Sequence, residues 1–452
     1  MKRLNSILFV LMMILGFQLS AQEPTVNEKL SVVDDKVNGI LERLATDEAD
    51  LSKLAKIKVS GYIQAQFQNF ESPALLAKSQ NYFSLRRVRV KFTYEAADGI
   101  KFVLQPDFAP GNLSLKDAYA VVNDRWTKAF SLWAGKFNRP NYEVEYSSSQ
   151  RELTERSLVI RTLYPGERAI GAKLEYNPVN VPIHMQLAVL NGNDGLTIAS
   201  STGTNLNATD NIDYDNFKDV MARVTYNLKL GNFGGLDLGA HGYFGALKSN
   251  GLVTYSSDYT STKTAQIGDK IGRNWLGGEF QLYADVLGGF SVKGEYIAGK
   301  NATTGFAPVG TTLGGANYQN NFAGYYLYLI KNLGKKNQFA FRYDSYDPNT
   351  DIKGKDITLK GYAATATTAK KMSGKGDLAT TTLGFAFHHY FDDNIRITLC
   401  YEIVQNEKAG VNASGVGNYT ESYTTNAGTT GTMDYSKVVN QNVLTLRLQA
   451  KF

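Results

Sequence analysis

Within the last ten residues, Val443–Phe452, apolar and polar side chains alternate strictly from Leu444 onward. Leu444, Leu446 and Leu448 fall on one face of an extended strand, while Arg447 falls on the other. A strand with one oily and one charged face suits a wall between lipid and a water-filled lumen. The pattern therefore predicts a membrane-spanning strand that closes the chain on an aromatic residue.

The N-terminus has the features of a secretory signal. Lys2 and Arg3 precede an apolar run over residues 7–17, and the small pair Ser20-Ala21 predicts cleavage before Gln22. No later apolar run reaches the roughly 18 residues that a membrane helix needs. Because backbone groups in lipid must be paired internally, a spanning mature chain has to form a closed barrel.

Charge and cysteine content argue against a nucleic-acid-binding protein and against an intramolecular disulfide. The formal net charge is +6, and the signal carries Lys2 and Arg3 but no acid, so the mature chain has 6 − 2 = +4. This positive charge is small, and the sequence has no concentrated basic patch of the kind found in nucleic-acid binders, so no nucleic-acid partner is expected. The single Cys400 rules out an intramolecular disulfide.

Residues 22–56 predict a short periplasmic coiled coil. Apolar residues recur at alternating spacings of four and three, interrupted at Asp47, with leucine leading at the a positions and β-branched residues at the d positions. This choice of residues favours coiled coils of three or four helices over coiled coils of two. The alternative is one amphipathic helix that folds against its own barrel. The recurring residues are Val26, Leu30, Val33, Val37, Ile40, Leu44, Leu51 and Leu54.

From residue 57 to 452 the apolar period changes to two, which predicts an all-β fold: a transmembrane antiparallel β-barrel of about sixteen strands. A β-solenoid is the structural rival, but the fixed repeat that it requires is missing. The expected strands cover residues 57–70, 83–95, 99–109, 114–123, 128–137, 168–177, 181–191, 217–229, 234–246, 272–284, 288–300, 320–331, 337–346, 379–391, 395–405 and 441–452. Short links alternate with long polar ones, as in porins.

Basic side chains gather on one face of the second strand. Arg87, Arg89 and Lys91 alternate with apolar residues, and a lipid-facing charge at the midplane costs about 2–4 kcal/mol, so the row should face the lumen. The same reasoning places Arg223 and Lys229 inside. One interpretation is an anion track, because guanidinium groups bind oxyanions through paired donors. The other is an ion-pair lattice with inward carboxylates.

The long link after the fifth strand, residues 138–157, is charged and lacks strand alternation. Folded into the lumen, it would narrow the passage and bring four arginines beside a passing solute. The alternative is a surface helix, since its charges pair at i,i+4 spacing. The arginines in and just after this link are Arg139, Arg151, Arg156 and Arg161.

Catalytic and metal-binding motifs are weak. The four histidines form no helical metal-binding pair, and no serine has a nucleophile-elbow context. The sequence therefore predicts a protein that is not an enzyme, with no cofactor and no metal; an outer-membrane hydrolase is the alternative. The histidines are His184, His241, His388 and His389.

Several segments resemble the phosphate-selective porin O and P family: Phe83–Val90, Leu115–Tyr119, Ala134–Pro140, Glu155–Ser157 and Tyr164–Ala172. The resemblance extends over most of the chain after residue 57. It implies a trimeric sixteen-stranded barrel with an inward third loop and basic residues that guide anions. By the same resemblance, Arg86 and Arg87 match the family's basic pair in the second strand.

One difference concerns the lumen wall. The resemblance implies a ladder of several arginines, whereas residues 217–229 offer only Arg223 and Lys229 at inward positions. We therefore expect a homotrimeric porin in the lipid of the outer membrane that passes small solutes passively, with a mild preference for anions such as phosphate. The alternative function is a surface anchor or adhesin with a blocked lumen.

Overall fold

The structure is a computed structural model. It describes residues 26–71, 81–109, 111, 113–192, 197–199, 205–207, 213, 215–249, 251–286, 288–305, 316–357, 374–411, 419–424, 428 and 430–452. Two compact units are present, divided after Ile57. The predicted signal lies outside the described residues.

The first unit contains one long helix, α2 (Val26–Ala55). Its predicted apolar seam lies open along the helix: Leu30 is 60% exposed, Ile40 63% and Leu44 53%. The helical period predicted from the sequence is therefore present. Among the helices of the described residues, none is both long and apolar enough to span a membrane.

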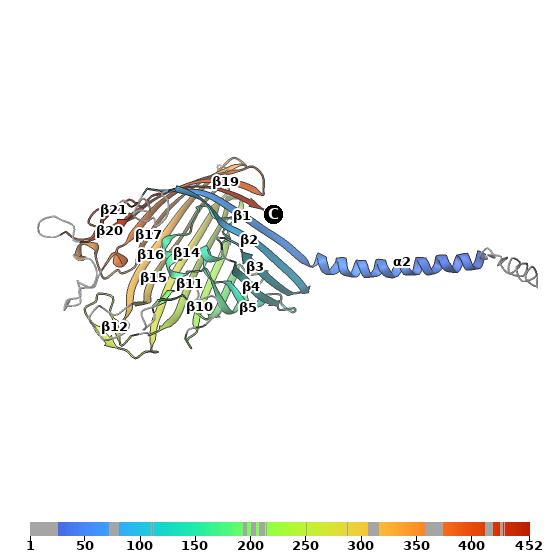
Figure 1. The fold of residues 1–452 in the computed structure, drawn as a ribbon, viewed down its shortest axis with the longest axis horizontal. Coiled ribbons are helices and arrows are strands. Elements are labelled where there is room, and N and C mark those ends of the chain that lie inside the picture. The colour runs from blue at the N-terminus through green and yellow to red at the C-terminus, as the bar shows by residue number, and fades with distance from the viewer. Residues whose placement is uncertain are drawn as a thin grey trace, which may run out of the picture. The chain divides into compact units, whose positions relative to one another are not determined.

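The second unit is an antiparallel β-barrel (Figure 1). Its main sheet holds 18 strands, of which β12 and β13 form a short hairpin in a loop, so 18 − 2 = 16 strands build the wall in the described residues. All sixteen predicted strands are present, with ends shifted by a few residues. The wall strands are β1 (Ile57–Phe70), β2 (Asn81–Ala97), β3 (Ile100–Asp107), β4 (Ser114–Asn123), β5 (Phe130–Asn138), β6 (Arg168–Tyr176), β7 (Ile183–Leu190), β10 (Asp219–Lys229), β11 (Gly234–Lys248), β14 (Lys270–Ala284), β15 (Phe290–Gly305), β16 (Ala316–Leu333), β17 (Asn337–Asp347), β18 (Thr380–Tyr390), β19 (Ile395–Asn406) and β22 (Val443–Lys451).

The last strand closes the wall against the first. β22 pairs with β19 on one side and with β1 on the other, where Gln66 lies opposite Arg447. Figure 1 shows the blue β1 beside the red C-terminal strands. At the end of this seam, the backbones of Gly61 and Phe452 exchange two hydrogen bonds of 2.9 and 3.0 Å. Closure leaves no open sheet edge to face lipid.

Side chains of β22 follow the predicted alternation. Leu446 is 46% exposed on the outside of the wall, whereas Arg447 is 3% exposed on the inside. Aromatic pairs project outward at the short-turn end: Tyr94 stacks on Phe102 with ring centroids 6.5 Å apart, and Phe130 packs against Tyr176 at 4.8 Å. Such aromatic girdles mark the membrane interface of outer-membrane barrels.

The strands are joined by short turns at one end and by long loops at the other. The short turns include a 3-10 turn, η2 (Gly231–Phe233), and the long loops carry 3-10 turns η3 (Gly354–Asp356) and η5 (Lys375–Asp377). The long loops also contain short hairpins that the sequence pattern missed. These are β8 (Thr197–Ala199) with β9 (Asn205–Asn207), β12 (Val253–Tyr255) with β13 (Thr262–Thr264), and β20 (Thr420–Thr424) with β21 (Thr430–Asp434).

Three long loops share a small hydrophobic core, which we call the loop cluster. Tyr259 comes from the loop after β11, Ile357 and Leu378 from the loop after β17, and Tyr419 and Tyr435 from the loop after β19. The Tyr259 hydroxyl donates a 2.7 Å hydrogen bond to Asp377. These loops therefore pack as one body.

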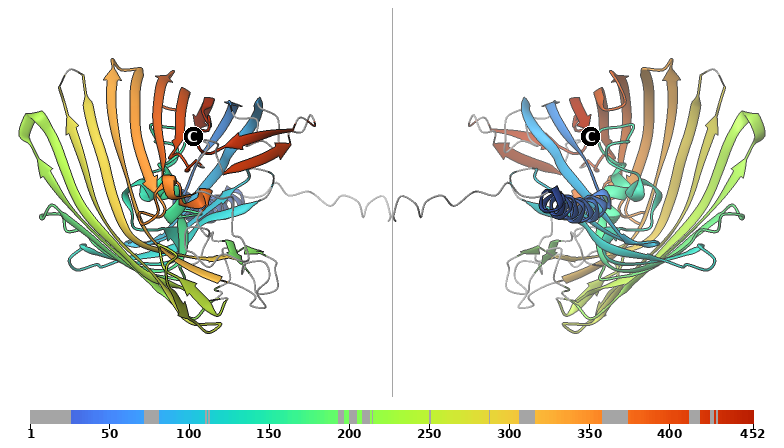
Figure 2. Two further views of the ribbon diagram at one scale, coloured as in Figure 1. Left: turned by 90° about the vertical axis from the view of Figure 1, so that its left-hand side faces the viewer. Right: turned by 90° about the vertical axis from the view of Figure 1, so that its right-hand side faces the viewer.

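The segment between β5 and β6, residues 139–167, lies inside the ring of strands (teal in Figure 2). We call it the inward loop. It contains two short helices, α3 (Tyr142–Glu145) and α4 (Leu158–Leu163). Val159, Ile160 and Leu163 of α4 are at most 1% exposed and pack into an apolar core against the inner wall. The lumen-facing wall is therefore partly apolar, which strict polar-in alternation does not predict.

A charge on the lipid face should be costly only within the membrane. Leu446→Arg should lower the free energy of unfolding by about 2–4 kcal/mol, because no lumen water can reach the guanidinium at the midplane. Urea unfolding of the barrel in lipid vesicles measures this difference. Leu113→Arg is the matched control, because Leu113 is 71% exposed in the loop between β3 and β4. Equal losses in both variants would contradict the lipid-facing assignment of Leu446.

Candidate functional site

The inward loop contacts strands on all sides of the barrel, which requires it to lie in the lumen. Ser148 hydrogen-bonds Tyr62 of β1, and Asn141 donates to Glu295 of β15 at 2.6 Å. On the strand next to β15, Trp275 of β14 donates a 2.9 Å hydrogen bond to Tyr164. The loop therefore spans the cross-section of the lumen and narrows it.

Glu155 is the centre of one charge cluster. It accepts two hydrogen bonds from Arg86 of β2, at 2.8 and 2.9 Å, and one of 3.1 Å from Arg447 of β22. Arg87 lies 3.5 Å away and also donates to Gln64 at 2.8 Å. One loop carboxylate thus joins the strands on both sides of β1 through several guanidinium groups.

Glu167 is the centre of a second cluster. Arg151 lies 2.9 Å from one oxygen of Glu167, and Arg156 pairs with the same oxygen. Arg168 of β6 pairs with the other oxygen at 2.5 Å and with Asp117 of β4 at 2.9 Å. Two arginines of the loop and one of the wall therefore share a single loop carboxylate.

A third cluster lies on strands β6, β10 and β14. Glu145 of α3 pairs with Arg223 of β10 at 2.9 Å and with Lys173 of β6 at 3.5 Å. Arg223 also pairs with Glu279 of β14 at 2.6 Å, and Lys173 with Glu175 at 2.6 Å. Acidic residues of the inward loop therefore neutralise basic residues of the wall on both sides of the lumen.

A polar cavity of about 310 Å³ remains between the inward loop, strands β1 to β6 and the end of β22. We call it the basic cavity. Its charged lining has five basic and three acidic residues, 5 − 3 = +2. In the described part of the chain, Lys91 and Lys451 enter no ion pair, so their charges are not neutralised locally. The charged residues are Arg89, Lys91, Arg156, Arg168, Lys451, Asp117, Glu145 and Glu167.

The structure divides the nine basic residues that the sequence selects into three groups. Arg87, Arg89, Arg151, Arg156 and Arg223 are paired with carboxylates, Arg89 with Asp107 at 2.7 Å. Arg139 is buried and donates to the carbonyl of Pro165 at 2.9 Å. The remaining three, Lys91, Arg161 and Lys229, form no ion pair among the described residues.

Those three cations come from three different elements of the barrel. Lys91 lines the basic cavity, and Arg161 is exposed on α4 in the inward loop. Lys229 is exposed at the end of β10 beside the η2 turn. Among the basic residues that the sequence selects, these three are the ones that no carboxylate pairs with in the described part of the chain.

Two further basic residues of the site lie on the last strand. Arg447 binds Glu155 and Lys451 lines the basic cavity. Both stand on the polar face that the strict alternation of residues 444–452 assigns to the lumen. The signal needed to find them was therefore present in the sequence.

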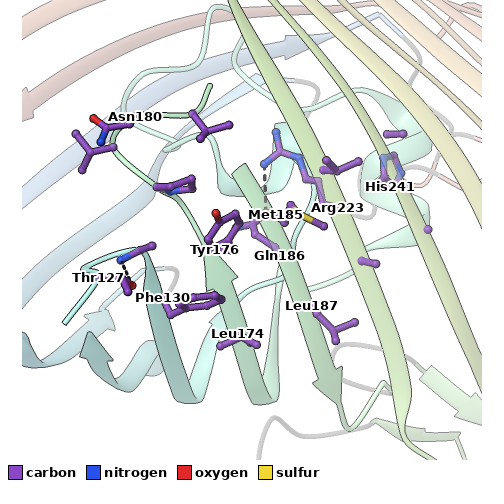
Figure 3. Close-up of a pocket in the computed structure, with 18 of the residues that line it drawn as sticks. Thr127, Phe130, Leu174, Tyr176, Asn180, Met185, Gln186, Leu187, Arg223 and His241 are labelled. Carbon is purple, nitrogen blue, oxygen red and sulfur yellow. Dashed lines mark hydrogen bonds between the residues drawn. The ribbon is translucent and has the colours of Figure 1, made fainter. Parts of the chain in front are cut away.

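A larger hollow of about 1110 Å³ lies on the other side of the wall (Figure 3). Its lining is mostly outward apolar side chains such as Phe130, Leu174, Met185 and Leu187. Met185 and Leu187 are 48% and 50% exposed, while the intervening Gln186 is 4% exposed on the inner face. This outer hollow therefore faces lipid and is not part of the lumen.

Comparisons with known proteins agree with this architecture. The sequence pattern of the phosphate-selective porin O and P family matches residues 57–452. An anion-selective porin from Comamonas acidovorans has a similar fold, with TM-score 0.52 at 12% identity over 88% of this chain and 99% of that chain. The outer membrane channel DcaP of Acinetobacter baumannii gives 0.51 at 11% identity over 88% and 97%. A search of curated proteins found no match.

Glu155 should decide whether the inward loop stays in place. Glu155→Gln leaves Arg86, Arg87 and Arg447 without their shared carboxylate, and breaking a buried pair costs about 3–5 kcal/mol. We expect trypsin to cleave the variant after Arg151 or Arg156, which are 5% and 3% exposed in the native barrel.

Mass spectrometry of timed digests measures that cleavage. Glu421→Gln is the matched control, because Glu421 pairs with Lys375 at 2.7 Å in the external loops. If Glu155→Gln is as resistant as the control, the cluster does not hold the loop.

Proposed function

The chain belongs to the phosphate-selective porin O and P family, and its barrel is an outer-membrane barrel; we propose that it passes small solutes by diffusion, with a mild preference for anions such as phosphate. Porins are channels and not, in general, enzymes. The observation that carries the proposal is the basic cavity between loop and wall, with its net charge of 5 − 3 = +2.

The preference is assigned to the cations that remain unpaired. Most lumenal arginines are neutralised by carboxylates, so their field at a distance is small. Lys91, Lys451, Arg161 and Lys229 keep their charge and attract anions along the passage. A mild preference follows, because four separated cations with hydrated surroundings do not form a dehydrating phosphate cage. The name of the similar Comamonas porin, which describes it as anion-selective, points the same way.

Phosphate is the finer part of the proposal. Arg87, Arg89, Arg139, Arg151, Arg156, Arg161 and Arg223 supply guanidinium groups, whose paired donors suit phosphate oxygens. A phosphate ion would have to compete with Glu155 or Glu167 for Arg87, Arg151 and Arg156. It would have to compete with Asp107 for Arg89, and with Glu145 and Glu279 for Arg223. We therefore expect weak phosphate binding that saturates only at high concentration.

A surface anchor with a blocked lumen is the second candidate. It is favoured by the tight apolar packing of the inward loop, where Val144, Leu153 and Leu163 are at most 2% exposed. Single-channel recording separates the two functions. Steady open steps support the porin, and their complete absence supports the anchor.

We further propose that three chains assemble into a trimer. The seam of α2 leaves Leu30, Ile40, Leu44 and Leu51 between 53% and 63% exposed. Apolar side chains at a and d positions bury themselves against partner helices in a coiled coil. Residues 22–56 would then act as a periplasmic coiled coil, after removal of residues 1–21 as the signal.

Outer-membrane lipid is the proposed partner of the outer wall. The outer hollow is lined by apolar side chains and faces away from the lumen. Acyl chains of the surrounding lipid can pack against such a surface without leaving polar groups unpaired, because the backbone N–H and C=O groups of the strands already hydrogen-bond to one another.

Neutralising the unpaired lysines should reduce the preference for anions. Lys91→Gln with Lys451→Gln should move the zero-current potential in a salt gradient toward cation preference. The shift should grow as salt falls, because the Debye length rises from about 10 Å at 0.1 M to about 30 Å at 0.01 M. Planar-bilayer recording gives the potential directly.

Lys437→Gln is the control for this experiment, because Lys437 lies in an external loop with its side chain 80% exposed. An unmoved potential in the double variant would show that the basic cavity does not lie on the conduction path.

Removing the helical segment tests the assembly. Deletion of residues 22–54 should lower the share of trimer in detergent extracts, since the exposed seam of α2 loses its partners. Native mass spectrometry measures the mass of the oligomer. Leu44→Asp, within the seam, should weaken the trimer less than the deletion does. A solvent-side change, Glu42→Gln, should leave the trimer intact. An unchanged trimer mass after deletion would show that the barrel walls associate alone.

A further inference from the structure

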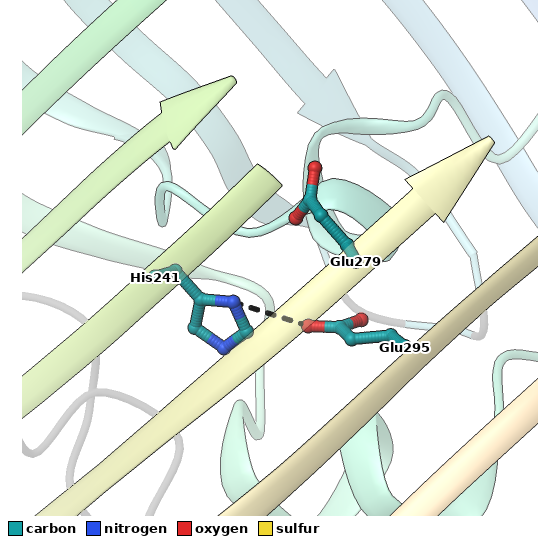
Figure 4. A group of neighbouring side chains, drawn as sticks. All are labelled: His241, Glu279 and Glu295. Carbon is teal, nitrogen blue, oxygen red and sulfur yellow. Dashed lines mark ion pairs between the residues drawn. The ribbon is translucent and has the colours of Figure 1, made fainter. Parts of the chain in front are cut away.

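Three buried side chains meet on the inner wall where no role in passage requires them (Figure 4). They are His241 of β11, Glu279 of β14 and Glu295 of β15, with exposures of 4%, 6% and 3%. Each offers a ligand atom, and these atoms lie within 4.8 Å of one another. One imidazole nitrogen and two carboxylate oxygens form a donor set that borderline transition metals accept.

His241 is the least satisfied member of the group. Neither of its ring nitrogens has a hydrogen-bond partner among the described residues. Its Nδ1 lies 3.4 Å from Oε1 of Glu295, beyond the usual length of a hydrogen bond. Bonds of about 2.0–2.1 Å to a tetrahedral Zn²⁺ hold two ligands about 3.3–3.4 Å apart. The spacing of this pair is thus that of two ligands of one ion, while the ligand atoms of the whole group lie within 4.8 Å of one another.

The wall is shaped to accommodate these side chains. Gly277 lies opposite His241 in the ladder, and a Cβ there would overlap the imidazole ring. Gly239 lies opposite Glu279, where a Cβ would come within 2.7 Å of Cγ of Glu279. A larger residue at either position would displace a ligand, so the two glycines belong to the site.

Surrounding residues orient the carboxylates. Tyr326 and Asn141 each donate a 2.6 Å hydrogen bond to Glu295, one to each oxygen. Arg223 binds both oxygens of Glu279, at 2.6 and 3.2 Å. Partners of this kind fix the orientation of the carboxylates, and each carboxylate oxygen keeps a second lone pair for an ion.

The local charge is negative. Around the group, Glu145, Glu175, Glu279 and Glu295 face only Arg223 and Lys173 in ion pairs, so 4 − 2 leaves two negative charges if all ionise. Uncompensated buried charge is costly, and a divalent cation would cancel it. Glu145 also lines the basic cavity, whereas His241, Glu279 and Glu295 do not.

We propose that His241, Glu279 and Glu295 bind one divalent transition-metal ion, of which Zn²⁺ fits the donor set best. Imidazole disfavours Mg²⁺ and Ca²⁺, which prefer oxygen ligands. A water molecule completes the four positions. The ion would tie β11, β14 and β15 together beneath the inward loop, and it does not depend on what the lumen conducts.

Metal retention by the tag-free, detergent-purified full chain tests the proposal. Protein stripped with chelator is incubated with ZnCl₂ or MgCl₂, dialysed, and analysed for metal by mass spectrometry. We expect about one Zn²⁺ per chain and no retained Mg²⁺. Loading with Co²⁺ should give the visible absorption of a tetrahedral site. Retention of no Zn²⁺ by the wild-type chain would overturn the proposal.

Variants identify the ligands. His241→Ala should lose the retained Zn²⁺, while His388→Ala should keep it, because His388 is an equally buried wall histidine whose two nitrogens contact Thr398 and the carbonyl of Glu152. Tyr326→Phe removes only the hydroxyl that orients Glu295 and should weaken binding about 10–100-fold while the barrel folds normally. Equal retention by His241→Ala and wild type, or unchanged affinity in Tyr326→Phe, would refute the site.

Discussion

The pairing of the last strand with the first is the constraint on which the rest of the structure depends. A sheet in lipid cannot leave an edge unpaired, since each buried backbone group without a partner is costly. β22 meets β1 from Tyr62 to Phe70, and this seam turns sixteen strands into a ring with an inside. Only then do alternate side chains acquire opposite environments, lipid for Leu446 and lumen for Arg447. The enclosed space in turn makes it possible for one loop to touch opposite walls.

The inward loop converts a wide ring into a narrow, mostly neutralised passage. Its carboxylates Glu145, Glu155 and Glu167 each meet basic residues of the wall. The same ion pairs that hold the loop also remove most of the positive field that the arginines would otherwise provide. Position and selectivity are therefore coupled: a change that frees an arginine for a solute also loosens the loop that shapes the passage.

The alternation of apolar and polar residues predicted the strands of the wall, because a strand with one buried face has a recognisable sequence period and a fixed pairing register. It could not predict which charges pair, since Glu155 meets Arg86 and Arg447, which lie 69 and 292 residues away in the chain. For the same reason, the histidine motifs sought in the sequence missed the group formed by His241 with Glu279 and Glu295, whose members come from three neighbouring strands. The short hairpins of the long loops were missed because their strands have only three to five residues, too few to show a period.

The loop cluster has a consequence for how the cell surface changes over time. Because Tyr259, Ile357 and Tyr435 from three loops share one small core, the shape that one loop presents depends on the other two. A substitution selected to escape an antibody or a phage at one loop would alter the neighbouring epitopes as well. Conversely, the exposed face of the cluster can vary freely while its core residues keep their size. Surface variation in this barrel is therefore expected to be correlated between loops that are far apart in the sequence.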